Sequence, residues 1–133
     1  MPFVQVQDRT IHYVDAEGPG TPLLLLHAFP LDGRMWADTQ AALADRFRVI
    51  APDLSGFGRS DVPADPDGYS VDRWADEAAA VLDACRVERA IVGGCSMGGY
   101  VSFAFLRRHR QRAIGLVLVD TRAEPDDEAT RAS

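Results

Sequence analysis

The segment that most restricts the fold of this chain is a strand that turns abruptly into a helix, with one serine at the turn. Residues 91–100 read Ile-Val-Gly-Gly-Cys-Ser-Met-Gly-Gly-Tyr, so a short apolar run leads into a Gly-x-Ser-x-Gly pattern. Gly94 and Gly98 remove the Cβ atoms that would collide as strand and helix close up, and the strained turn points the Ser96 hydroxyl outward. The pattern predicts a nucleophilic serine on a strand-turn-helix unit.

The rest of the chain alternates predicted strands and helices. Apolar runs and helical spacing predict buried strands at 23–26, 48–52, 90–94 and 114–119, and helices at 35–44, 71–85 and 96–108. Two short alternating runs, 3–7 and 10–15, predict a hairpin at a sheet edge. Strands that alternate with helices form mostly parallel sheets. We therefore predict an α/β fold with a mostly parallel, twisted sheet of about six strands and flanking helices.

Length and charge limit the classes of partner. The chain has 133 residues, of which 47% are hydrophobic, which is enough to bury the core of one domain. The net charge is −6, the sequence pI is about 4.9 and the basic residues are scattered along the sequence, so we do not expect a nucleic-acid partner. The N-terminus does not resemble a signal peptide, and no apolar run reaches the length of a membrane span. We expect a cytoplasmic protein that does not bind membranes.

Neither the cysteines nor the glycines form a cofactor motif. Cys85 and Cys95 do not have the number or spacing of a disulfide framework or a metal site, and we expect them to be small buried hydrophobic residues. The glycines before the helix at 96–108 are not followed by the lysine of a phosphate loop, and the G-x-G-x-x-G spacing is absent. We expect no metal ion and no organic cofactor.

Three motifs, in order along the chain, resemble the α/β-hydrolase fold family. His27-Ala28-Phe29-Pro30 is similar to the family's oxyanion loop after the third strand, and residues 53–61 are similar to its loop after the fourth. The Gly-x-Ser-x-Gly turn is similar to the nucleophile elbow after the fifth strand. Residues 116–124 are similar to members grouped with enol-lactone hydrolases and cofactor-free haloperoxidases. The chain resembles the N-terminal half of such a protein, which implies a serine hydrolase of esterase or lactonase type that acts on a small carboxylic ester or lactone.

The resemblance implies a role for each matching residue. Ser96 is the nucleophile that forms an acyl-enzyme. The backbone N–H groups of Phe29 and Met97 form the oxyanion hole, and Met97 gains from its place at a helix N-terminus. Trp36 is a further candidate wall of the substrate pocket. Asp120 ends the last predicted strand at the edge where some relatives place their acid, although an aspartate there is also a common helix-capping residue.

The resemblance covers only part of the family fold. In the family, the missing C-terminal half holds the last two strands, the cap, the acid after the seventh strand and the histidine after the eighth. We therefore expect residues 1–120 to form a partial α/β-hydrolase domain. Apart from Pro125, residues 121–133 contain no apolar side chain larger than alanine, and we expect them to form a polar C-terminal tail at the start of the missing cap region. The triad is expected to be incomplete within this chain.

None of the three histidines is an obvious replacement for the missing base. His109 follows Ser96 by thirteen residues on one predicted helix, which places it roughly 20 Å away. His12 lies in the predicted edge hairpin. His27 ends the strand expected beside the elbow, where the family role is to shape the oxyanion loop. Asp53 also ends a strand at this edge and is expected to organise the glycine-rich loop by local hydrogen bonds.

The sequence also allows a non-catalytic role for this chain, and it predicts self-association. Ser96 in isolation could be a plain helix N-cap, and the chain could be a catalytically silent fragment that serves as a folding or association module. The predicted strand at 114–119 has no following strand, and an apolar edge of this kind promotes pairing. We therefore expect a homodimer through this edge.

Overall fold

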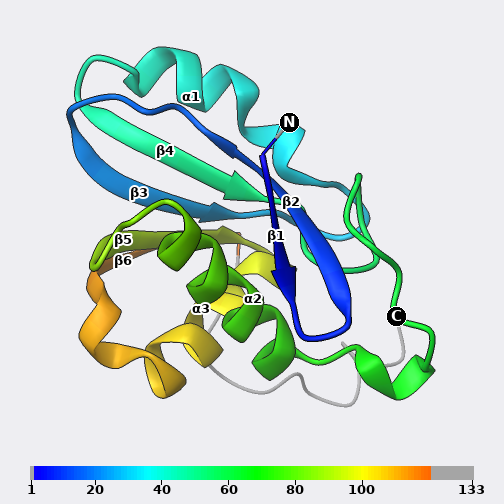
Figure 1. The fold of residues 1–133 in the computed structure, drawn as a ribbon. Helices are drawn as coiled ribbons and strands as arrows, with labels where there is room; N and C mark the ends of the chain where they lie inside the picture. Colours follow the sequence, from blue (N-terminus) through cyan, green and yellow to red (C-terminus); the bar gives the residue numbers. More distant parts are fainter. Residues whose placement is uncertain (1, 121–133) are drawn as a thin grey trace.

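The computed structural model describes residues 2–120, which form one six-stranded sheet with helices on both faces (Figure 1). The strand order is β1 (Phe3–Val6), β2 (Arg9–Asp15), β4 (Phe47–Pro52), β3 (Thr21–Leu26), β5 (Ala90–Cys95) and β6 (Ala113–Val119). The hairpin β1–β2 occupies one edge and pairs antiparallel with β4, whereas β4, β3, β5 and β6 run parallel. The predicted α/β class and the edge hairpin are confirmed.

The helices follow the predicted order with one difference. α2 (Val71–Ala84) and α3 (Met97–Arg108) agree with the prediction, and two single turns, η2 (Pro66–Gly68) and η3 (Arg110–Arg112), connect other elements. The helix predicted at 35–44 instead begins as a 3₁₀ turn, η1 (Gly33–Trp36), and continues as α1 (Ala37–Leu43). A Cβ at Gly33 would lie 2.9 Å from the Ala51 carbonyl oxygen, so this turn is pressed against β4.

The alternation of side chains along β3 divides the core into two clusters. Leu24 and Leu26 face the larger cluster, which α2 and α3 cover. Leu23 and Leu25 face the opposite side of the sheet and pack in a smaller cluster with Trp36 and Val49. Because β3 is buried on both faces, its sequence is an uninterrupted run of leucines rather than an alternating pattern.

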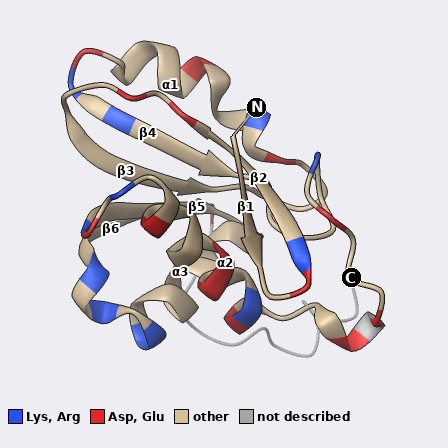
Figure 2. Ribbon diagram, in the orientation of Figure 1, with Lys and Arg blue, Asp and Glu red and all other residues tan. Residues whose placement is uncertain are grey.

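Arginines gather at the C-terminal end of α3 and in the segment that follows (Figure 2). The prediction that basic residues are scattered is therefore wrong for this surface. The acidic side chains of α2 neutralise most of the patch: Arg107 pairs with Asp72, Arg108 pairs with Asp76 at 2.8 Å, and Arg112 pairs with Asp83. The first two ion pairs join α3 to α2, and the third joins η3 to α2.

The expectation about membrane spans can be checked within the described residues only, and the expectation about the C-terminal tail falls outside them. Within residues 2–120, no helix is both long enough and apolar enough to cross a membrane. The predicted polar tail at 121–133 lies outside the described residues.

Candidate active site

Ser96 occupies the turn between β5 and α3 at the carboxyl edge of the parallel strands. Its backbone angles are φ 53° and ψ −112°, a region that non-glycine residues rarely adopt. The Ser96 N–H donates to the Val119 carbonyl oxygen at 3.0 Å, and the Ser96 carbonyl accepts the Gly99 N–H at 2.9 Å. These bonds at both sides of the residue hold the strained turn, while the side chain is exposed.

Both glycines of the Gly-x-Ser-x-Gly motif lie so close to backbone atoms that a Cβ would not fit. A Cβ at Gly98 would overlap the Leu26 carbonyl oxygen and would lie 2.8 Å from the His27 carbonyl oxygen. A Cβ at Gly94 would overlap the Gly98 carbonyl oxygen. α3 therefore begins in direct contact with the end of β3, which is the close approach that the sequence pattern predicts.

Met97 is the first residue of α3 and is half-buried. The first four N–H groups of a helix have no acceptor within the helix, and the helix dipole adds partial positive charge at this end. The position of Met97 directly after Ser96 is thus suited to an oxyanion donor.

Phe29 lies in the loop that follows β3. β3 is the neighbour of β5 in the sheet, and Leu26 of β3 pairs with Gly94 of β5. The Phe29 side chain is 69% exposed, and its ring contacts the Phe57 ring edge-on at a centroid distance of 5.9 Å. The Ala28 carbonyl oxygen, on the same peptide unit as the Phe29 N–H, accepts the Leu31 N–H at 2.8 Å. This loop therefore has a defined backbone conformation next to the start of α3.

The His27 side chain is fully buried and has both ring nitrogens in use. The Leu54 N–H lies 3.0 Å from Nε2, and because an N–H can only donate, Nε2 is the unprotonated acceptor. Nδ1 therefore carries the proton and donates to the Ala28 carbonyl oxygen at 3.1 Å. Burial lowers the pKa of His27, which also favours this neutral form. These contacts fit a role in shaping the loop and leave no nitrogen for a general base.

Asp120 lies directly after β6, beside the serine turn. β6 pairs with β5 so that Val119 is opposite Cys95. The Ser96 N–H donates to the carbonyl oxygen of Val119, the residue before Asp120. Burial raises the pKa of the nearby Cys95 thiol, and the negative charge of Asp120 raises it further. Asp120 has φ 50° and is exposed. The structure therefore brings Ser96 and Asp120 to the same edge of the sheet.

Trp36 lies on the face of the sheet that α1 partly covers. Its side chain is buried in the smaller core cluster. It also lines an apolar cavity of about 500 Å³ that reaches Gly94 and Val119, close to the serine turn. The role of Trp36 in substrate binding stays a prediction.

The other two histidines lie elsewhere. His109 follows α3 at the end opposite Ser96, and its Nε2 is 2.7 Å from Asp76 Oδ1. His12 is in β2, with its ring 5.6 Å from the Phe3 ring. The prediction that neither lies near Ser96 in the same chain agrees with these positions. Within residues 2–120, no three His, Cys, Asp or Glu side chains come together as metal ligands would.

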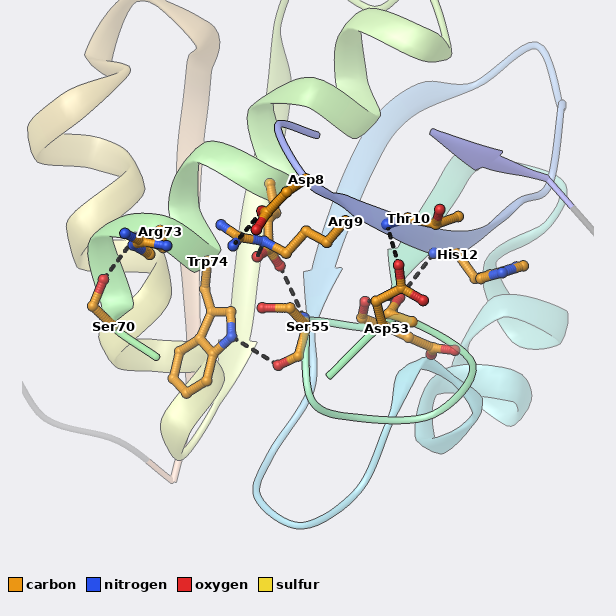
Figure 3. Close-up of polar contacts among 12 residues, drawn as sticks. Asp8, Arg9, Thr10, His12, Asp53, Ser55, Ser70, Arg73 and Trp74 are labelled. Carbon is orange, nitrogen blue, oxygen red and sulfur yellow. Dashed lines mark hydrogen bonds and ion pairs between the residues drawn. The ribbon is translucent and has the colours of Figure 1, made fainter. Parts of the chain in front are cut away.

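The loop after β4 is held by buried polar contacts (Figure 3). Asp53 Oδ1 accepts the Gly33 N–H at 2.7 Å and Oδ2 accepts the Arg59 N–H at 3.1 Å, which confirms its predicted role in organising this loop. Sequence reasoning missed the buried pair of Arg9 and Glu77, whose carboxylate accepts the Ser55 N–H. One signal was available: Glu77 lies next to Ala78 on the apolar face of α2.

A family model described as "alpha/beta hydrolase fold" matches residues 21–132. A 2-hydroxymuconate semialdehyde hydrolase from Pseudomonas sp. (strain CF600) is 42% identical over 105 residues, which are 77% of this chain and 37% of that protein. Haloalkane dehalogenase 2 from Mycobacterium tuberculosis (strain ATCC 25618 / H37Rv) is 39% identical over 117 residues, which are 88% of this chain and 40% of the dehalogenase. The chain spans less than half the length of these curated relatives.

Solved structures give the same result. A thermophilic esterase from Thermogutta terrifontis with malate bound has a TM-score of 0.87 and 40% identity, over 97% of this chain and 49% of that chain. Est816, described as an N-acyl homoserine lactone degrading enzyme, has a TM-score of 0.85 and 38% identity, over 90% of this chain and 45% of Est816. The relatives carry different activities on one fold, so the substrate must be argued from the site.

Proposed function

The chain belongs to the alpha/beta hydrolase fold family, and on that premise we propose that it carries the nucleophile and the oxyanion-binding loops of a serine hydrolase of esterase or lactonase type. The observation that carries the proposal is the strained backbone of Ser96 at φ 53° and ψ −112°, exposed at the carboxyl edge of the sheet. A serine that merely caps a helix has an extended backbone and accepts a hydrogen bond from the first turn. Ser96 makes no such side-chain cap.

In the proposed reaction, Ser96 Oγ attacks the carbonyl carbon of an ester or lactone. The Oγ–carbon bond forms, the carbonyl oxygen becomes an oxyanion, and the N–H groups of Met97 and Phe29 stabilise its charge. Collapse breaks the bond between the carbonyl carbon and the alkoxy oxygen and leaves the acyl group on Ser96. The Oγ proton passes to solvent water during the attack, and the alkoxide takes up a proton from solvent. When the substrate is a lactone, the resulting alcohol stays attached to the acyl group. Water then releases the acid in a second step, which requires a base.

We propose that the triad is incomplete within this chain. His27 has both ring nitrogens engaged, and His109 lies beside Asp76 at the far end of α3. Asp120 is the candidate acid, because it follows β6 beside the serine turn. The histidine would then come from polypeptide beyond this sequence, in keeping with the greater length of the relatives. Without it, the oxyanion hole and binding still give roughly 10³-fold to 10⁴-fold catalysis over water.

The substrate class rests on the site and on two neighbours. Both proposed oxyanion donors are backbone groups, so the side chains of Phe29 and Met97 are free to contact an apolar acyl group. The Thermogutta protein is described as an esterase and Est816 as a lactone-degrading enzyme. A small carboxylic ester or lactone is therefore the proposed substrate, with no metal or organic cofactor in the proposed mechanism.

The proposal is tested by covalent labelling of the intact chain with a fluorophosphonate. We expect one adduct per chain in the wild type and none in Ser96→Ala. Ser102→Ala is the matched control, since Ser102 is a buried serine of α3 whose hydroxyl donates to the Gly98 carbonyl oxygen at 2.7 Å. Equal labelling of wild type and Ser96→Ala would refute the assignment of the nucleophile.

A catalytically silent association module is the second candidate function, and the engagement of the His27 and His109 rings in other contacts favours it. In this case Ser96 would keep its backbone conformation without reacting. The labelling experiment separates the two candidates, because only a functional oxyanion site accelerates attack on the probe.

We also propose that the chain forms a homodimer through β6. Within residues 2–120, β6 pairs with a strand on one side only, and its apolar side chains are exposed, Val117 at 48%. An uncovered apolar strand edge is a template for pairing with a second chain. We expect light scattering across a concentration series to show a dimer, and Val117→Lys to shift it to monomer while circular dichroism stays unchanged. A folded wild-type monomer at high concentration would contradict the proposal.

A further inference from the structure

We propose that Glu77 is a positioning residue for the oxyanion loop: its carboxylate fixes the loop after β4, this loop holds the His27 ring, and His27 sets the direction of the Phe29 N–H. The inference rests on the proposed function, since it concerns the same oxyanion site. It adds a buried residue of α2 that does not touch the substrate.

The first step is the contact between Glu77 and the loop after β4, whose neighbours Arg9, Ser55 and Trp74 are labelled in Figure 3. Glu77 and Arg9 are both buried, with the Glu77 side chain fully so. Glu77 Oε2 accepts the Arg9 Nε–H at 2.8 Å, and Oε1 accepts the Ser55 N–H at 2.9 Å. The Ser55 carbonyl oxygen in turn accepts the Trp74 Nε1–H at 3.1 Å. Both polar groups of the Ser55 backbone are thus held by side chains of α2.

The second step leads from Ser55 to His27. Leu54 is the preceding residue, and its N–H donates to His27 Nε2 at 3.0 Å. This bond selects the tautomer of His27 that is protonated on Nδ1. The loop also contacts the ring through Phe57, whose centroid lies 5.2 Å from that of His27 in an edge-on arrangement. If this loop moved, the His27 ring would no longer be held in one tautomer or in one orientation.

The third step leads from His27 to the oxyanion donor. Nδ1–H donates to the Ala28 carbonyl oxygen at 3.1 Å, and the Leu31 N–H donates to the same oxygen at 2.8 Å, so the ring supplies one of the two hydrogen bonds that hold this carbonyl. In a trans peptide, this carbonyl and the N–H of Phe29 lie in one plane and point in opposite directions. A hydrogen bond that holds the Ala28 carbonyl therefore also aims the Phe29 N–H. Oxyanion stabilisation depends on this aim, because the donor must point at the charge that develops in the transition state.

Fold stability alone does not require a carboxylate at this position. Burial raises the pKa of Glu77, which reflects the cost of removing its charge from water. Replacing a buried ion pair by apolar residues of similar volume is often neutral or stabilising. What an apolar residue cannot do is accept the Ser55 N–H. The hydrogen-bond acceptor that Glu77 provides for the Ser55 N–H is therefore the feature to vary.

The experiment compares two double variants that both remove the buried charges. Arg9→Met with Glu77→Gln keeps a side-chain oxygen for the Ser55 N–H, whereas Arg9→Met with Glu77→Leu does not. The rate constant for fluorophosphonate labelling reports on the oxyanion site, and ¹⁵N–¹H correlation spectra of the histidine rings report on the tautomer of His27. Asp76→Asn, on the same helix but paired with Arg108 and His109, controls for loss of an α2 contact.

We expect the Gln double variant and Asp76→Asn to label within about twofold of wild type and to keep His27 protonated on Nδ1. The Leu double variant should label about tenfold to 100-fold more slowly, because small misplacements of catalytic groups have effects of this size, and should show mixed tautomers. Equal rates and tautomers in the two double variants would overturn the proposal. If the wild type is not labelled at all, the proposed function fails separately. The comparison of His27 tautomers then decides alone. A difference between the two double variants supports the positioning role of Glu77, and the same tautomer in both overturns it.

Discussion

Gly98→Ala is expected to destabilise the protein by about 3 kcal/mol or more, which is a large share of the stability of a domain of this size. The added Cβ would overlap the Leu26 carbonyl oxygen and would also crowd the His27 carbonyl. These are backbone atoms of a buried strand and its following loop, so they cannot move aside as a flexible side chain would. Urea unfolding, followed by circular dichroism, measures the change.

Gly115→Ala is the matched control, because a Cβ at this position in β6 meets nothing within 4 Å. Its stability should change by no more than about 0.5 kcal/mol, as is usual for exposed positions. If Gly98→Ala unfolds at the same urea concentration as Gly115→Ala, the close approach of α3 to β3 is wrong.

Phe29→Pro is expected to reduce the labelling rate of Ser96 by about 10² to 10³, the usual effect of removing one oxyanion donor. Proline has no N–H, so the substitution deletes the proposed donor and leaves an apolar residue in place. The Phe29 side chain is 69% exposed, so little core packing is lost. The measurement is the second-order rate constant for the fluorophosphonate.

Phe29→Ala separates the N–H from the ring, since it keeps the donor and removes the contact with Phe57. Its labelling rate should stay within about tenfold of wild type, because the N–H donor is kept and the ring that is removed is mostly exposed. A folded Phe29→Pro variant that reacts as fast as Phe29→Ala would remove the Phe29 N–H from the mechanism.

The sequence was sufficient for the sheet and for the serine turn because both depend on local patterns. The leucine run of β3 indicates a strand buried on two faces, and the structure places one core cluster on each side of it. Gly94 and Gly98 predict contacts with backbone, and these contacts occur. Pairing between distant strands then follows from the rules for parallel sheets.

The polar network behind the oxyanion loop could not be predicted in the same way. Arg9 and Glu77 are 68 positions apart in the sequence, and no periodic pattern links a residue of the edge hairpin with one of α2. The ring contacts of His27 also depend on a loop that is distant in sequence, through the Leu54 N–H. The first turn of the helix predicted at 35–44 differs because Gly33 is pressed against β4, a tertiary contact that local propensity does not include.

The most direct test of the central claim is the time course of a p-nitrophenyl ester reaction, with the site of acylation mapped by mass spectrometry. A nucleophile and oxyanion hole without their histidine should give slow acylation of Ser96, with up to one p-nitrophenolate released per chain, followed by much slower turnover. The adduct should lie on Ser96 and should be absent in Ser96→Ala. Rapid multiple turnover that Ser96→Ala abolishes would contradict the incomplete triad. A time course that Ser96→Ala leaves unchanged would contradict the nucleophile itself.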